Sequence, residues 1–72
     1  MEEKLYPFSS KKHIHDLSFR SDRAANEGCF ELREQLDAII CKAAGGVSPI
    51  WLTGKEYALA MDSVRWAAEH RR

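Results

Sequence analysis

The chain has 72 residues, with 11 basic and 11 acidic side chains, so its formal net charge is zero. A neutral chain lacks a strong general attraction to phosphate backbones or anionic lipid. Its large apolar side chains suffice for a core between helices but are few for a domain that also encloses a catalytic pocket. We therefore predict one domain over residues 1–72, with no enzymatic activity and no cofactor.

Residues 1–20 show the least regular pattern, and we expect them to form an arm that lies on the rest of the domain. Pro7 biases Tyr6 toward an extended conformation. From His13 to Phe19 the apolar spacing fits either a short strand or a turn of helix, and seven residues are too few to decide.

Residues 21–44 predict the first of two amphipathic helices. Ser21 is suited to be its N-cap. Apolar residues then recur at helical spacing and form one stripe, which includes Cys29 and Leu36. Gly28 falls inside this pattern and weakens the helix by about 1 kcal/mol relative to alanine.

Residues 45–53 form the predicted connection. Gly45 begins it, and glycine adopts the left-handed conformation that ends a helix at least cost. Thr53 and Glu56 then match a capping box, in which each side chain satisfies a backbone N–H of the other residue. This pair predicts that the second helix covers residues 54–70.

The expected fold is mostly all-α, a helical hairpin with an irregular N-terminal arm. The second helix is apolar on two sides, since Leu59 and Trp66 lie opposite its main apolar stripe. One side can pack on the first helix, and the other needs the arm or a second chain. We expect two hairpins to dimerise into a four-helix arrangement through Leu59, Trp66 and the first helix.

The two cysteines, Cys29 and Cys41, cannot form a disulfide within one helix, because twelve residues of helix separate them by about 18 Å. Free thiols and the lack of a recognisable signal peptide favour a reducing compartment. No apolar run approaches the roughly 18 residues that a membrane span requires. The protein is therefore expected to be cytoplasmic and not to bind membranes.

The cluster of His13, His15 and Asp16 is the one group of residues that resembles a metal site, with Cys29 as a conceivable fourth ligand. Structural zinc sites usually show paired Cys-x-x-Cys or His-x₃-His spacings, and none occurs here. Cys29 also belongs to the apolar stripe, where an inert buried thiol is the ordinary outcome. We predict surface polar residues and no metal.

The leading functional prediction is a protein–protein interaction module that binds and modulates, for example inhibits, a larger cytoplasmic protein. Small inhibitors carried by phages and mobile elements share this short, neutral, catalytically empty profile. Trp66 and Leu59 are the expected apolar anchors, because tryptophan is enriched in interface hot spots. The expected acidic surface for a basic partner comprises Glu27, Glu31, Glu34 and Asp37.

The alternative is a small dimeric DNA-binding regulator that uses the basic residues within residues 11–23. These residues are Lys11, Lys12, Arg20 and Arg23. A strand at residues 13–19 followed by two helices resembles the ribbon-helix-helix family of DNA-binding proteins. That family has a short first helix close to its strand, whereas a long helix is predicted here, and DNA-binding domains usually carry a basic surplus.

Overall fold

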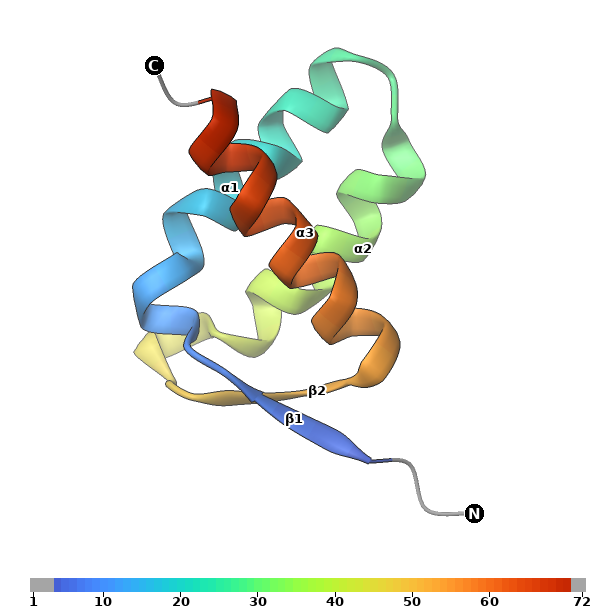
Figure 1. Ribbon diagram of the computed structural model, residues 1–72. Coiled ribbons are helices and arrows are strands. Elements are labelled where there is room, and N and C mark those ends of the chain that lie inside the picture. The colour runs from blue at the N-terminus through green and yellow to red at the C-terminus, as the bar shows by residue number, and fades with distance from the viewer. Residues whose placement is uncertain (1–3, 71–72) are drawn as a thin grey trace.

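A computed structural model describes residues 4–70 of the chain. Residues 1–3 of the predicted arm and the two final arginines lie outside the described part. Helices make up most of the structure, and a small two-stranded sheet closes one end of them (Figure 1). In chain order the elements are β1 (Leu5–Phe8), α1 (Ser10–Asn26), α2 (Phe30–Lys42), a 3₁₀ turn (Ala44–Gly46), β2 (Ile50–Thr53) and α3 (Gly54–His70).

The mostly helical class is confirmed, but three helices replace the predicted hairpin of two. The predicted irregular arm contains β1 and more than half of α1. This helix escaped the sequence pattern because its buried side includes the small polar residues Ser10 and Ser21 beside Leu17 and Ala24. Ser21 is therefore no N-cap: it lies within α1, and its hydroxyl donates to Asp37 of α2 at 2.7 Å.

The predicted continuous helix over residues 21–44 is wrong, because the chain reverses at residues 27–29. Gly28 has a φ of 79°, in the left-handed region that glycine adopts most easily. The amide of Gly28 donates to Ala25 O and that of Cys29 to Ala24 O, which is the Schellman pattern of a helix end. Cys29 is consequently exposed in the turn and does not belong to a buried stripe.

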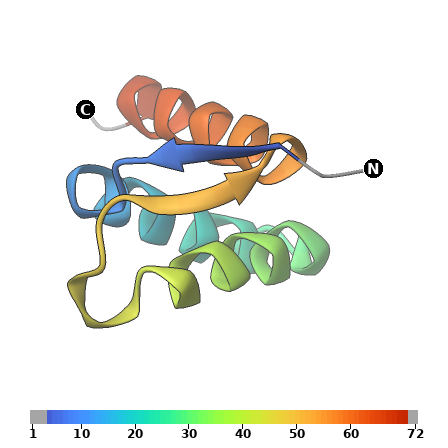
Figure 2. The same ribbon diagram turned by 90° about the horizontal axis from the view of Figure 1, so that it is seen from below.

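The two strands pair antiparallel and form a ribbon at one end of the helices (Figure 2). The side of the ribbon that faces the core holds Phe8 opposite Ile50, both nearly fully buried. Along the other side, Pro7 pairs with Trp51, whose side chain is 56% exposed. Part of the predicted 45–53 loop is thus a strand that buries every second residue.

The predicted second helix is confirmed as α3, and the capping box at its start is present. The Thr53 hydroxyl accepts the Glu56 amide N–H at 3.2 Å, and Glu56 Oε1 accepts the Thr53 amide N–H at 3.0 Å. Both orphan donors of the helix start are therefore satisfied within four residues.

Helix α1 packs against both other helices and thereby positions them. Ser21 and Ala24 on α1 and Ala60, Ser63 and Ala67 on α3 are buried small residues, which let helices approach closely. The hydrophobic core joins all the elements. It comprises Phe8, Leu17, Leu36, Ile39, Ala43, Ile50, Leu52 and Ala60.

Candidate interaction groove

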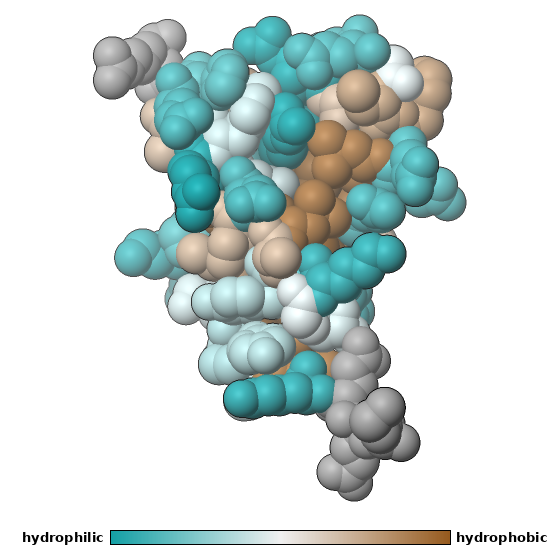
Figure 3. Space-filling model, turned by 45° about the vertical axis from the view of Figure 1, so that its right-hand side comes forward, coloured by the Kyte–Doolittle hydropathy of each residue, from teal (hydrophilic) through white to brown (hydrophobic). Residues whose placement is uncertain are grey.

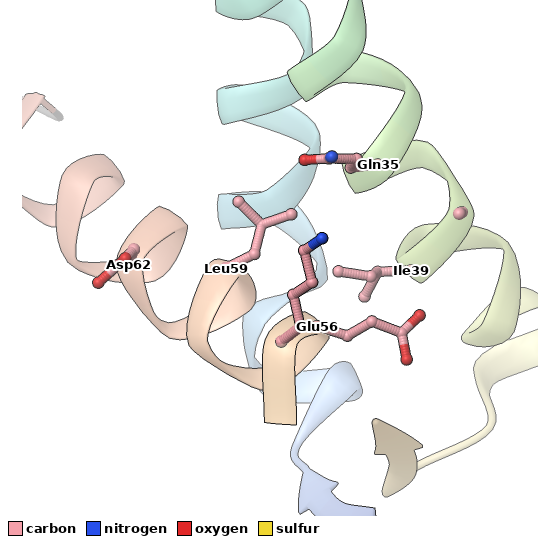
Figure 4. Close-up of a pocket in the computed structure, with 7 residues that line it drawn as sticks. Gln35, Ile39, Glu56, Leu59 and Asp62 are labelled. Atoms are coloured by element: carbon pink, nitrogen blue, oxygen red, sulfur yellow. The ribbon is translucent and has the colours of Figure 1, made fainter. Parts of the chain in front are cut away.

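Between α2 and α3 the surface is hollowed into a groove of about 500 Å³. Leu59 on α3 and Ile39 on α2 point toward one another across it, and α1 passes behind them (Figure 4). The lining combines this apolar pair with a polar rim. It consists of Gln35, Ala38 and Ile39 from α2 and Lys55, Glu56, Leu59 and Asp62 from α3.

The groove exists because α3 buries its small residues instead of turning Leu59 fully inward. Ala60, Ser63 and Ala67 form the fully buried stripe of this helix, whereas Leu59 is only partly buried. Seen from this side, an apolar patch lies in a hollow between hydrophilic margins (Figure 3). A hydrophobic surface rimmed by polar groups is typical of interaction sites.

One end of the groove is closed by a contact between α2 and α3. The Lys42 ammonium donates to both carboxylate oxygens of Glu56 at 2.9 Å. This hydrogen bond lowers the pKa of the Glu56 carboxyl below its ordinary value; burial opposes the effect, and the bonds from Thr53 add to it. Glu56 is therefore a carboxylate held in place by partners within the chain.

A second hollow adjoins the groove at the start of α2. Its lining shares Gln35 with the groove and extends to Leu32, Glu31 and Phe30. Phe30 is 66% exposed, an unusual position for a phenylalanine in so small a domain. The two hollows together follow one face of α2 from Glu31 to Ile39, a rise of about 12 Å.

The two predicted apolar anchors lie in different surroundings. Leu59 lines the groove. Trp66 instead packs on side chains of its own chain, with its ring 4.1 Å from the His70 ring and 4.3 Å from the Arg20 guanidinium. Phe19 adds a tilted ring contact at 5.3 Å. These contacts leave Trp66 half-buried between α1 and the end of α3.

The structure does not keep the four predicted acidic residues on one helix. Glu31 and Glu34 are exposed on α2, whereas Glu27 lies in the turn that follows α1. Asp37 is used within the domain, because one carboxylate oxygen accepts the Ser21 hydroxyl and the other lies 3.4 Å from Arg33. Only Glu31 borders one of the hollows described above.

The four predicted basic residues all lie on α1. Lys11 and Lys12 are exposed in its first turn, and Arg20 and Arg23 lie near Trp66, at 4.3 and 5.9 Å from the ring centre. The expected resemblance to ribbon-helix-helix proteins loses its basis, because residues 13–19 are helical. The strand of this chain lies earlier and pairs with β2 of the same chain.

The possible metal ligands do not converge. His13 Nδ1 lies 3.5 Å from Asp16, and His15 is exposed. Within residues 4–70, no three histidine, cysteine or acidic side chains are grouped as a metal ion would require. No helix in the same range is long and apolar enough to cross a membrane.

Sequence patterns missed most of the groove. The sequence predicts one long helix that contains Gln35, Ala38 and Ile39, and this pattern does not indicate that they face α3 across an open space. The turn at Gly28 was the missing information, because it sets where α2 begins and which face it presents.

Comparison of the chain with protein-family models, with curated proteins and with solved structures finds no match. The functional argument therefore rests on the geometry of the groove and on the charges around it.

Proposed function

We propose that this protein is a small non-enzymatic interaction module that binds a larger protein through the α2–α3 groove and modulates its activity. The observation that supports the proposal is the partly buried Leu59, which lies in an open groove above the buried Ile39 and inside a polar rim. A domain of 72 residues has little apolar surface to spare, so a large hydrophobic side chain left in an open groove is better explained by a partner than by stability.

The chemistry of the lining agrees with binding more than with catalysis. Its seven residues include no histidine, cysteine or hydroxyl side chain that could serve as a nucleophile. Glu56 is held by Lys42 and Thr53, and its pKa is lowered, which makes it a poor general acid or base near neutral pH.

The homodimer expected through Leu59 and Trp66 is not included in this proposal. The Trp66 ring stacks on the His70 ring and contacts the Arg20 guanidinium of its own chain, so part of its surface is already covered. We expect a monomer in light scattering at concentrations where the module binds its target, and a stable dimer would reopen that alternative.

A second candidate, nucleic-acid binding by α1, has one observation in its favour. Lys11, Lys12 and Arg23 are exposed, and no ion pair joins them to another residue in the range 4–70. If this candidate is right, the chain retards duplex DNA, the shift weakens steeply with salt, and Arg23→Glu weakens it further. We expect no such shift, because the whole chain has no basic surplus.

The interaction proposal is tested with two matched alanine-to-glutamate variants. Ala38 lines the groove and is exposed, so Ala38→Glu places a charge in the groove without disturbing the core. Ala58→Glu makes the same change at an exposed position of α3 outside the groove lining. Circular dichroism and thermal unfolding serve as controls that both variants fold like the wild type.

Affinity capture from a host lysate treated with nuclease then compares the three proteins. We expect a stoichiometric partner that the wild type and Ala58→Glu retain and that Ala38→Glu loses. A partner retained equally by all three proteins would place the interaction elsewhere. A capture that disappears with nuclease treatment would favour the nucleic-acid candidate.

A further inference from the structure

The groove is concave and elongated, and its walls are two helices that meet at one end and separate toward the other. Lys42 of α2 contacts Glu56 of α3 at the narrow end. From there the walls continue past Ile39 and Leu59 to Gln35 and Asp62 (Figure 4). Two helices standing apart on a third leave a trough of the shape that a further helix fills, and a partner helix can dock its apolar face in such a groove.

The charges along the groove differ from one end to the other. The ion pairs among residues 4–70 are His13–Asp16, Arg33–Asp37 and Lys42–Glu56. Asp62 at the wide end of the groove and Glu31 in the adjoining hollow therefore have no ion-pair partner in the described part of the chain. Lys55 is unpaired in the same sense and lies beside Glu56 at the narrow end.

From these observations we infer that the groove receives a single amphipathic helix of a partner protein, with basic residues over Asp62 and the adjoining Glu31 and an apolar stripe on Leu59 and Ala38. This inference rests on the proposed interaction function and gives its partner a chemistry. The groove and the adjoining hollow together extend about 12 Å along α2, which matches an apolar stripe at positions i, i+3 or i+4, and i+7.

A second copy of this chain is a less suitable occupant. Its own helices already bury their apolar stripes on α1 or in the core. Two identical concave grooves pressed together would also leave their centres unfilled, and such voids forfeit the contacts that stabilise an interface. The acidic ends therefore call for a basic helix that comes from elsewhere.

The test uses two synthetic peptides of about 16 residues, or about 24 Å when helical. Both carry the same leucine stripe, and their flanking positions hold lysine in one peptide and glutamate in the other. Binding to the full chain is followed by ¹⁵N–¹H correlation spectra at peptide concentrations up to about 1 mM. We expect shifts centred on Gln35, Ala38 and Leu59.

The lysine peptide is expected to bind about tenfold more tightly than the glutamate peptide at low salt, since each exposed ion pair adds little and two act together. The double variant Glu31→Lys with Asp62→Lys should reverse this preference. Glu69→Lys, a matched charge change at an exposed residue of α3 outside the groove, should leave it unchanged.

Several results would overturn the inference. Equal affinity for both peptides would remove the charge argument, and shifts centred on the exposed face of the ribbon around Trp51 would move the docking surface. Concentration-dependent shifts of the same groove residues without peptide, with a doubled mass, would make a second copy the occupant. If neither peptide binds but Ala38→Glu still abolishes partner capture, the interaction function stands. Only the helical, basic character proposed for the partner is then wrong.

Discussion

Helix α3 makes two very different contacts, one with α1 and one with α2. Against α1 it buries Ala60, Ser63 and Ala67 almost completely. Toward α2 it presents the larger Leu59, yet a groove of about 500 Å³ separates the two helices there. The closed contact is built from small residues that let helices approach, and the open one leaves Leu59 only partly buried. On the proposed function, stability depends on one side of α3 and partner binding on the other.

The largest expected effect comes from truncating a leucine in the core, and it is compared with truncation of the leucine that lines the groove. Leu36 is fully buried in the core, and its replacement by alanine should cost about 2–5 kcal/mol of unfolding free energy. Leu59→Ala should cost less than half as much, because part of that side chain is already in water. Urea unfolding of both variants measures the difference. Equal losses would mean that the groove side is packed as tightly as the core.

The next prediction concerns substitutions that increase side-chain volume. Ala60→Leu inserts a large side chain into the closed contact and should destabilise the domain by about 1–3 kcal/mol. Ala38→Leu makes the same change in the open groove and should alter stability by less than about 0.5 kcal/mol. Thermal unfolding of the two variants provides the comparison. A costly Ala38→Leu would show that no open space exists between α2 and α3.

The turn at residues 27–29, which separates α1 from α2, can be tested by whether one substitution raises or lowers the stability of the domain. If residues 21–44 formed one helix, Gly28→Ala would stabilise it by about 1 kcal/mol. Because Gly28 has a φ of 79°, we expect the variant to lose about 1 kcal/mol or more instead. An added Cβ would meet no atom within 4 Å, so the loss reports backbone conformation alone. Stabilisation would contradict the turn and, with it, the groove.

The sequence could predict those elements whose signals are local. The reciprocal bonds of Thr53 and Glu56 involve residues three apart, and the end of the preceding helical region at Gly45 follows from glycine's freedom at positive φ. The Gly28 turn has the same kind of signal, but an apolar stripe continued past it and concealed the break. Helix α1 was missed because Ser10 and Ser21 are buried through hydrogen bonds to distant residues, which no local pattern reveals.

The groove could not be predicted, since it depends on how far apart two helices lie after both have packed on a third. The side-chain spacing predicts that Leu59 lies apart from the main apolar stripe of its helix, and Leu59 lines the groove. Trp66 was singled out by the same reasoning, and there tertiary contacts with Arg20 and His70 account for much of its surface. Side-chain spacing alone does not distinguish these two outcomes.

The smallest expected effect concerns the ion pair between Lys42 and Glu56, which closes the narrow end of the groove. Because the Lys42 hydrogen bond lowers the pKa of Glu56 in the folded state, the unfolded chain binds a proton there more readily. Stabilisation from this pair is therefore fully present above the ordinary glutamate pKa of about 4.3 and is lost as the pH falls through the lowered value.

Both groups are partly exposed, with side-chain accessibilities of 44% for Lys42 and 27% for Glu56, so the pair should contribute no more than about 1 kcal/mol. Lys42→Gln removes the charge while the Thr53 bonds to Glu56 can remain. We expect wild type and variant to differ in stability at pH 7 and to converge as the pH falls through the lowered pKa of Glu56, as followed by urea unfolding at decreasing pH. A difference that is independent of pH would mean that the side chain of Lys42 contributes by packing and not through the carboxylate, and the closed end of the groove would then not depend on this ion pair.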